Sequence, residues 1–228
     1  MDSMNSQGER NVAVISGKIA SALTFSHEVY GEGFYCFTVS IMRLSNTYDE
    51  IPVIVSERLA DSGEFRPGRF VKIDGQFRSY NSLNGGPKLS LMVFARDIRF
   101  IDDPEEEENI NQVVLNGFIC KPPIYRTTPF NREITDILLA VNRAYNKSDY
   151  IPCISWGRNA RYCGKRAVGD NVRVTGRIQS RQYQKKLPNG EVLTKTAYEV
   201  SVSKLELIIQ EEPASAAAAA PLEGAEKP

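Results

Sequence analysis

The chain contains two copies of one unit. Identical residues recur at a spacing of 100 positions, and no gap is needed to align them. The matching pairs are Asn11 and Asn111, Gly17 and Gly117, Arg43 and Arg143, Asp49 and Asp149, and Ile51-Pro52 and Ile151-Pro152. At a spacing of 101, Val71, Gly75 and Ser79 then meet Val172, Gly176 and Ser180. A duplication of this length in 228 residues predicts two domains of the same fold, each of ordinary domain size.

Charge separates the two copies. Residues 111–210 carry 16 Lys and Arg against 7 Asp and Glu, although the whole chain has a net charge of zero. The preceding segment DDPEEEENI is acidic, and like charges extend a linker. We expect five parts: a disordered N-terminus at 1–10, a first domain at 11–101, an acidic linker at 102–110, a second domain at 111–210, and a disordered Pro/Ala-rich tail at 211–228.

Composition excludes several classes of function. His27 is the only histidine, and no clustered carboxylates lie at strand ends, so we expect no enzyme. Cys36, Cys120, Cys153 and Cys163 form no CxxC pair, and we expect buried reduced thiols, no metal and no cofactor. The chain has no apolar run of about 20 residues and its start has no apolar secretory segment. We therefore expect no membrane association and a cytoplasmic location.

The hydrophobic pattern of each copy is that of short strands. In the second copy these are VVLNGFI, ITDILLAVNR, YIPCISW, NVRVTGRIQS and AYEVSVSKLELI, with one short helix expected in GRNARYCGKRAVGD. Five strands with a helix after the third are typical of the OB-fold, a partly open barrel that binds oligonucleotides or oligosaccharides. The sequence thus predicts an all-β chain of two tandem OB-fold barrels, with a small β-sandwich as the alternative.

Alternation divides the fourth strand of the second copy into two faces. Val172, Val174 and Ile178 lie on one face, and Arg177 and Tyr183 lie on the other. The first face is expected to pack in the core, and the second forms a cationic strip that can neutralise phosphates. On the third strand Tyr150 and Trp156 share a face, and core packing is an equally good interpretation of this pair.

The second copy resembles the bacterial single-stranded DNA-binding protein family. The resemblance is carried by NQVVLNGFI, LLAVNRAYNKSDYIPCISWGRNA, VGDNVRVTGRIQSRQY and YEVSVSKLELI, and it covers nearly all of residues 111–209. The first copy resembles the same family only at its scaffold positions.

The resemblance implies a binding site in the second copy alone. The positions at which family members stack bases are held here by four aromatic residues: Tyr145, Tyr150, Trp156 and Tyr183. The side chains expected along the DNA backbone are Arg143, Lys147, Arg158, Arg173, Arg177, Arg181, Lys185 and Lys186. In the first copy the four aromatic positions are taken by Ser45, Glu50, Ser56 and Ser82, so we expect that copy to serve assembly.

The resemblance further implies a non-enzymatic protein that binds single-stranded DNA without reading its sequence, in replication, recombination or repair. A homodimer with four OB units in total and a nucleoid location are also implied. The family also implies replication or repair proteins as possible partners, but the C-terminal PLEGAEKP departs from the family's acidic tail tip, since it has neither clustered Asp nor a terminal aromatic. Two alternatives remain open: an OB-fold interaction scaffold of a replication-restart or phage assembly, and a single-stranded RNA binder.

Overall fold

The computed structural model describes residues 10–60, 63–80, 90–103, 109–186 and 190–208. The disordered segments expected at 1–10, apart from Arg10, and at 211–228 lie outside the described residues, as do residues 104–108 of the acidic linker.

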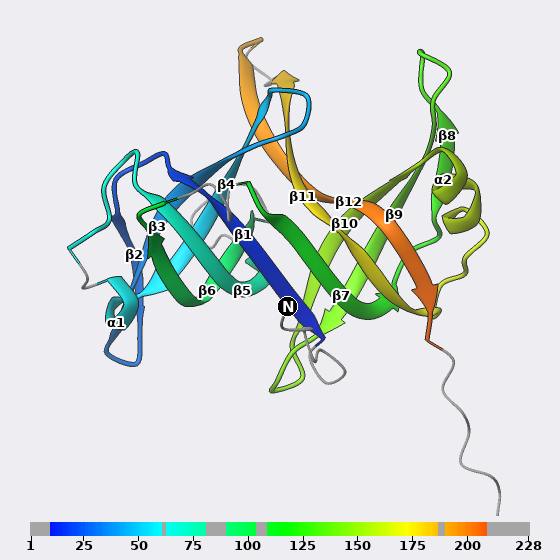
Figure 1. Cartoon of the computed structure of the whole chain (residues 1–228). Coiled ribbons are helices and arrows are strands. Elements are labelled where there is room, and N and C mark those ends of the chain that lie inside the picture. The colour runs from blue at the N-terminus through cyan, green and yellow to red at the C-terminus, as the bar shows by residue number, and fades with distance from the viewer. Residues whose placement is uncertain (1–9, 61–62, 81–89, 104–108, 187–189, 209–228) are drawn as a thin grey trace, which may run out of the picture.

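Each copy folds into six strands and one short helix (Figure 1). The first barrel consists of β1 (Asn11–Ile19), β2 (Thr24–Val29), β3 (Glu32–Met42), β4 (Tyr48–Ser56), α1 (Glu57–Ala60), β5 (Phe70–Tyr80) and β6 (Ser90–Ile101). The second barrel consists of β7 (Asn111–Ile119), β8 (Ile124–Thr127), β9 (Glu133–Asn142), β10 (Ser148–Trp156), α2 (Gly157–Cys163), β11 (Asn171–Lys186) and β12 (Val192–Leu207).

Strand pairing closes both units into five-stranded rings. In the second barrel β7 pairs with β9 and β11, β9 with β10, β11 with β12, and the parallel contact of β10 with β12 completes the ring. The first barrel repeats this connectivity with β1, β3, β4, β6 and β5. With the helix after the fourth strand in chain order, this is the OB-fold expected from the sequence.

Two details differ from the sequence prediction. A short strand, β2 or β8, pairs outside the ring with β3 or β9, so each barrel has one strand more than the five predicted. The helix α2 ends at Cys163 rather than continuing to Asp170. Gly169 has a φ of 94°, a left-handed conformation that glycine adopts easily, in a turn that follows the helix.

The barrel interiors are built from the expected strand faces. Val172, Val174 and Ile178 are fully buried, as the alternation along β11 predicted. Tight crossings need small residues: a Cβ atom at Gly17 would collide with the carbonyl oxygen of Ser40, and one at Gly117 would collide with that of Ala140. These repeated glycines let the first strand of each ring cross the next one closely.

The two barrels are joined by antiparallel pairing of β1 with β7 (Figure 1). Ala13 lies opposite Val113, which is its own counterpart at a spacing of 100 residues, so a pseudo-twofold axis passes between these residues. The amide of Asn116 donates to the carbonyl of Arg10 at 2.7 Å, and the amide of Ser16 donates to the carbonyl of Ile110 at 2.8 Å. Each barrel therefore makes the same contact with the other, as the two subunits do in an isologous dimer interface, although both barrels here belong to one chain.

Candidate nucleic-acid interface

Strand β10 places two aromatic side chains on the outer face of the second barrel. Ile151 and Cys153 point into the core, whereas Tyr150 and Trp156 are 47% and 39% exposed. The two rings stand six residues apart on one strand, about 20 Å at the usual rise per residue. They are therefore accessible to a ligand, and core packing, the alternative left open by the pattern, does not describe them.

Tyr145 is presented by the turn between β9 and β10. The amide of Arg143 donates to the carbonyl of Lys147 at 2.7 Å and closes this turn. Tyr145 and Asn146 both have positive φ angles, 59° and 54°, which are uncommon outside tight turns. The ring of Tyr145 is 95% exposed.

The fourth aromatic residue lies on the long hairpin of β11 and β12. Tyr183 pairs with Lys195 across these strands, and its side chain is 39% exposed. In Figure 1 this hairpin, drawn in gold and orange, projects beyond the body of the barrel.

The predicted backbone contacts divide into surface cations and cations held at the boundary between the barrels. Lys147, Arg158, Arg181 and Lys185 are exposed, and Arg173 is half-buried on β11. Lys186 lies at the end of β11, but its side chain is outside the described residues. Arg143 and Arg177 each form an ion pair with a buried aspartate.

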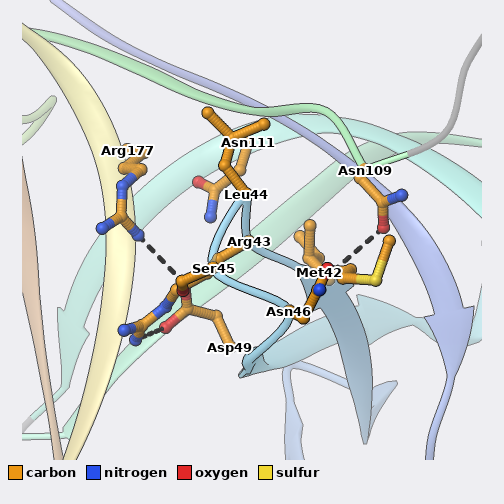
Figure 2. Close-up of a pocket in the computed structure, with 10 residues that line it drawn as sticks. Met42, Arg43, Leu44, Ser45, Asn46, Asp49, Asn109, Asn111 and Arg177 are labelled. Atoms are coloured by element: carbon orange, nitrogen blue, oxygen red, sulfur yellow. Dashed lines mark hydrogen bonds and ion pairs between the residues drawn. The ribbon is translucent and has the colours of Figure 1, made fainter.

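These aspartates form two reciprocal contacts between the barrels. Asp49 Oδ1 accepts hydrogen bonds from the amide and the hydroxyl of Ser180 at 2.6 and 3.0 Å. It also pairs with Arg43, and Arg177 donates to its Oδ2 at 3.1 Å (Figure 2). By the pseudo-twofold axis, Asp149 Oδ1 accepts from the amide and hydroxyl of Ser79 at 2.8 and 3.2 Å. Asp49, near the start of β4, and Asp149, near the start of β10, therefore each bind the opposite barrel.

The charge of Asp49 is stabilised in this position. Burial opposes its ionisation, yet hydrogen bonds from Arg43 and Ser180 outweigh that penalty and hold the pKa of Asp49 below its ordinary value. The same pairing raises the pKa of Arg43.

The first barrel offers no aromatic ring at the corresponding positions that the structure describes. Ser45 and Glu50 are exposed and Ser56 is half-buried, while Ser82 lies outside the described residues. Arg78, on β5, is half-buried and lies over the ring of Phe94 at 4.1 Å.

Four further exposed aromatic residues of the second barrel were not singled out from the sequence. They are Phe130 in the turn between β8 and β9, Tyr125 on β8, Tyr162 on α2 and Phe118 on β7, which are 87%, 45%, 42% and 38% exposed. A phenylalanine inside the polar turn TTPFNR was the available signal. Tyr125 donates a hydrogen bond to Glu133 at 2.5 Å, and Arg161 also binds Glu133, so this region is already ordered by its own contacts.

Neither metal nor thiol chemistry is indicated within the described ranges. No group of three or more potential metal-ligating side chains occurs there, and all four cysteines are free. Burial raises the pKa of the Cys153 and Cys163 thiols, which disfavours the reactive thiolate. Within these same ranges, no helix has the length and apolar character required to cross a bilayer.

The fold and these residues define the class as a tandem OB-fold protein whose second barrel carries exposed aromatic and cationic side chains. Residues 110–208 match the single-strand binding protein family. Single-stranded DNA-binding protein B of Bacillus subtilis is 37% identical over 84 residues, which are 32% of this chain and 72% of that protein. Single-stranded DNA-binding protein 1 of Lactococcus lactis is 38% identical over 82 residues, 33% of this chain and 55% of that protein. The chain belongs to the single-strand binding protein family.

Structural similarity extends over both barrels. The single-stranded DNA-binding protein of Thermus aquaticus, in a deletion mutant, aligns with a TM-score of 0.68 at 19% identity, covering 90% of this chain and 97% of that one. The wild-type Thermus aquaticus protein aligns with a TM-score of 0.66 at 18% identity. The tandem OB-fold predicted from the sequence is confirmed.

Proposed function

We propose that this protein binds single-stranded DNA through its second barrel, without catalysis and without reading base edges. The observation that carries the proposal is the exposure of Tyr145, Tyr150, Trp156 and Tyr183 on one barrel, at positions where the described part of the other barrel has no aromatic ring. Large aromatic side chains are highly buried on average, so four accessible rings on one domain indicate a ligand. Each ring can stack on any base, because every base has a π face.

The cations around the rings supply attraction for the phosphates. Arg158, Arg181 and Lys185 are exposed, and Lys147 lies two residues beyond Tyr145. A strand bound in this way is held by phosphate neutralisation and stacking, so its affinity falls steeply with salt. Arg143 and Arg177 lie at the boundary between the barrels, where their ion pairs with aspartates reduce the charge that they offer to DNA.

Replication, recombination and repair, all of which expose single strands in the cytoplasm, are the processes that this activity would serve. Two barrels per chain also lead us to propose a homodimer with four barrels. Sedimentation of the full chain at micromolar concentration tests that part, and a mass of a single 25.5 kDa chain would contradict it.

Trp156, the only tryptophan, gives a direct test. Its emission should be quenched when oligothymidylate is added, with much weaker quenching by duplex DNA of the same length. Equal responses to duplex and single strands would reduce the site to general electrostatic attraction and contradict the proposal. Tighter binding of a matching RNA strand would move the assignment to RNA.

A further inference from the structure

The two strands at the ends of the molecule belong to equivalent hairpins. Residues 24–34 comprise β2 and the start of β3, residues 124–134 comprise β8 and the start of β9, and these are the first and second outer hairpins. In the continuous order of strands β2 stands at one end and β8 at the other, and Figure 1 shows them on opposite sides of the molecule. Within the described residues, β2 pairs only with β3, and β8 only with β9. Each outer hairpin thus presents a free edge to which another molecule can bind.

Each outer hairpin carries two exposed aromatic side chains at matching positions. Phe25 and Tyr30 are 62% and 105% exposed, and their counterparts at a spacing of 100 residues, Tyr125 and Phe130, are exposed as well. Phe25 and Tyr125 occupy the same place in the strand register of their barrels, and Tyr30 and Phe130 lie in turns. Both copies have these rings although they differ at all four positions assigned to stacking, so base stacking does not explain them.

The two outer hairpins have opposite charge. The first contains Glu28 and Glu32 and neither lysine nor arginine, whereas the second contains Arg126, Arg132 and a single acidic residue, Glu133. The sign reverses at one matched position, because Glu32 and Arg132 are counterparts at a spacing of 100 residues. Two copies of the first hairpin would repel each other, whereas the first hairpin of one molecule attracts the second hairpin of another.

Glu28 and Arg132 are the charges available for such a contact. Both side chains are exposed, and neither forms an ion pair with another described residue. The other charged side chains of the outer hairpins have partners in their own barrel, and these pairs are Glu32 with Arg58, Arg126 with Asp136, and Glu133 with Arg161.

The negative charge also disfavours the first outer hairpin as a base-stacking site. Glu28 and Glu32 lie within two residues of Tyr30, and carboxylates repel the phosphates of a strand that stacks on this ring. An exposed aromatic tip with acidic neighbours is suited instead to a basic protein surface that also offers apolar contacts. The second outer hairpin is such a surface, since Ile124 and Phe130 are exposed beside its arginines.

We propose that the first outer hairpin of one molecule binds the second outer hairpin of the next, so that the partner is a second copy of this chain. The inference rests on the proposed function, because the contact acts between molecules that lie side by side on one DNA strand. Two different surfaces meet, and the contact therefore propagates along the strand instead of closing into a pair. The hairpins are short, so the contact is weak in free solution and becomes effective when DNA holds neighbouring molecules close together.

The test measures cooperativity, defined as the affinity per molecule for poly(dT) divided by the affinity for the shortest oligothymidylate that fully quenches Trp156. Glu28→Arg and Arg132→Glu should each lower this ratio roughly 5-fold, because an attraction between exposed charges becomes a repulsion. The double variant with both changes restores opposite charges across the contact and should recover most of the cooperativity. Any effect of a changed charge on DNA affinity itself cancels in the ratio.

The aromatic side chains provide a second measurement. Tyr30→Ser and Phe130→Ser should each lower the cooperativity by at least about 5-fold, since aromatic residues contribute much of the binding energy of protein interfaces. The matched control is Tyr48→Ser, which removes a tyrosine that is 60% exposed but lies outside both outer hairpins, and its cooperativity should not change. Equal melting temperatures would show that all the variants are folded.

Several results would overturn this contact while leaving DNA binding intact. One is an unchanged cooperativity in the four single variants, and another is a double charge variant that recovers nothing. Equal affinity of the unaltered protein for short and long strands would leave the outer hairpins to a different protein. A weaker affinity of Tyr30→Ser for the short strand, at unchanged cooperativity, would assign the first outer hairpin to DNA. Absence of any Trp156 response of the unaltered protein to single strands would instead contradict the proposed function itself.

Discussion

Asp49 of the first barrel binds Ser180 of the second, with Oδ1 2.6 Å from the amide nitrogen and 3.0 Å from the hydroxyl oxygen. The side chain of Asp49 is buried, and the two arginines that pair with it come from different barrels. Asp149 makes the matching contact with Ser79, so a carboxylate from each barrel accepts a hydrogen bond from a backbone amide of the other barrel. The two barrels are thus held by polar contacts on both sides of the β1–β7 pairing.

Removing this carboxylate should destabilise the protein. Asp49→Ala removes the buried carboxylate that pairs with Arg43 and accepts from the amide of Ser180, both of which are half-buried, and we expect a loss of about 3 kcal/mol in the free energy of unfolding. Urea denaturation followed by far-UV circular dichroism measures it. Glu50→Ala, at the exposed neighbouring position, is the control and should change stability by less than about 0.5 kcal/mol. Similar losses in the two variants would refute a structural role for the contact.

The same contact should contribute to acid sensitivity. The pKa of Asp49 is lowered in the folded protein, so its contribution is fully present above its unfolded pKa of about 3.9. The contribution disappears as the pH falls through the lowered folded pKa, where the carboxylate becomes protonated. The difference in unfolding free energy between the unaltered protein and Asp49→Asn should therefore be constant near neutral pH and shrink at the acid end. A difference that stays constant down to about pH 2.5 would show that the charge of Asp49 is not the stabilising feature.

Each aromatic platform should carry a measurable share of DNA affinity. Trp156→Ala and Tyr150→Ala should each weaken binding of oligothymidylate by about 1–3 kcal/mol, or roughly 5- to 150-fold. Fluorescence anisotropy of a labelled oligonucleotide measures this without using Trp156. Tyr48→Ala removes a tyrosine that is 60% exposed on the first barrel, and should change affinity less than 2-fold by this same argument. Equal effects at Tyr48 and Tyr150 would contradict the assignment of stacking to the second barrel.

The exposed cations should act through salt dependence. Replacing Arg158, Arg181 or Lys185 by Gln should each make the log-log salt slope shallower by about 0.7. Arg66→Gln, on the first barrel, should leave the slope unchanged. Titrations at several salt concentrations measure both, and an unchanged slope in all three variants would place the DNA path elsewhere.

The fold of each barrel could be predicted because the pattern that specifies its strands lies within short stretches of sequence. Alternation put Val172 and Val174 in the core, and the repeated spacing identified Asp49 and Asp149 as equivalents. The contact of Asp49 with Ser180, however, joins residues 131 positions apart in different domains, and no periodicity encodes the relative placement of two barrels. For that reason the pairing of Arg177 with Asp49 could not be predicted, and the DNA contact expected of Arg177 stays a prediction.

The exposed aromatic residues show the same limit. Period-two alternation could not decide whether Trp156 faces the core or solvent, because β10 is buried on one side and partly covered on the other. In the folded barrel Trp156, at the end of β10, is 39% exposed.

Covalent fusion of the two barrels has a consequence for evolution as well as assembly. In a symmetric dimer of separate chains, every mutation is imposed on both partners at once, and dilution separates them. Here the β1–β7 pairing is intramolecular and persists at any concentration, and each half accepts substitutions alone. The two halves can therefore differ in the aromatic rings that they carry, as they do here, whereas a twofold assembly of identical chains could not.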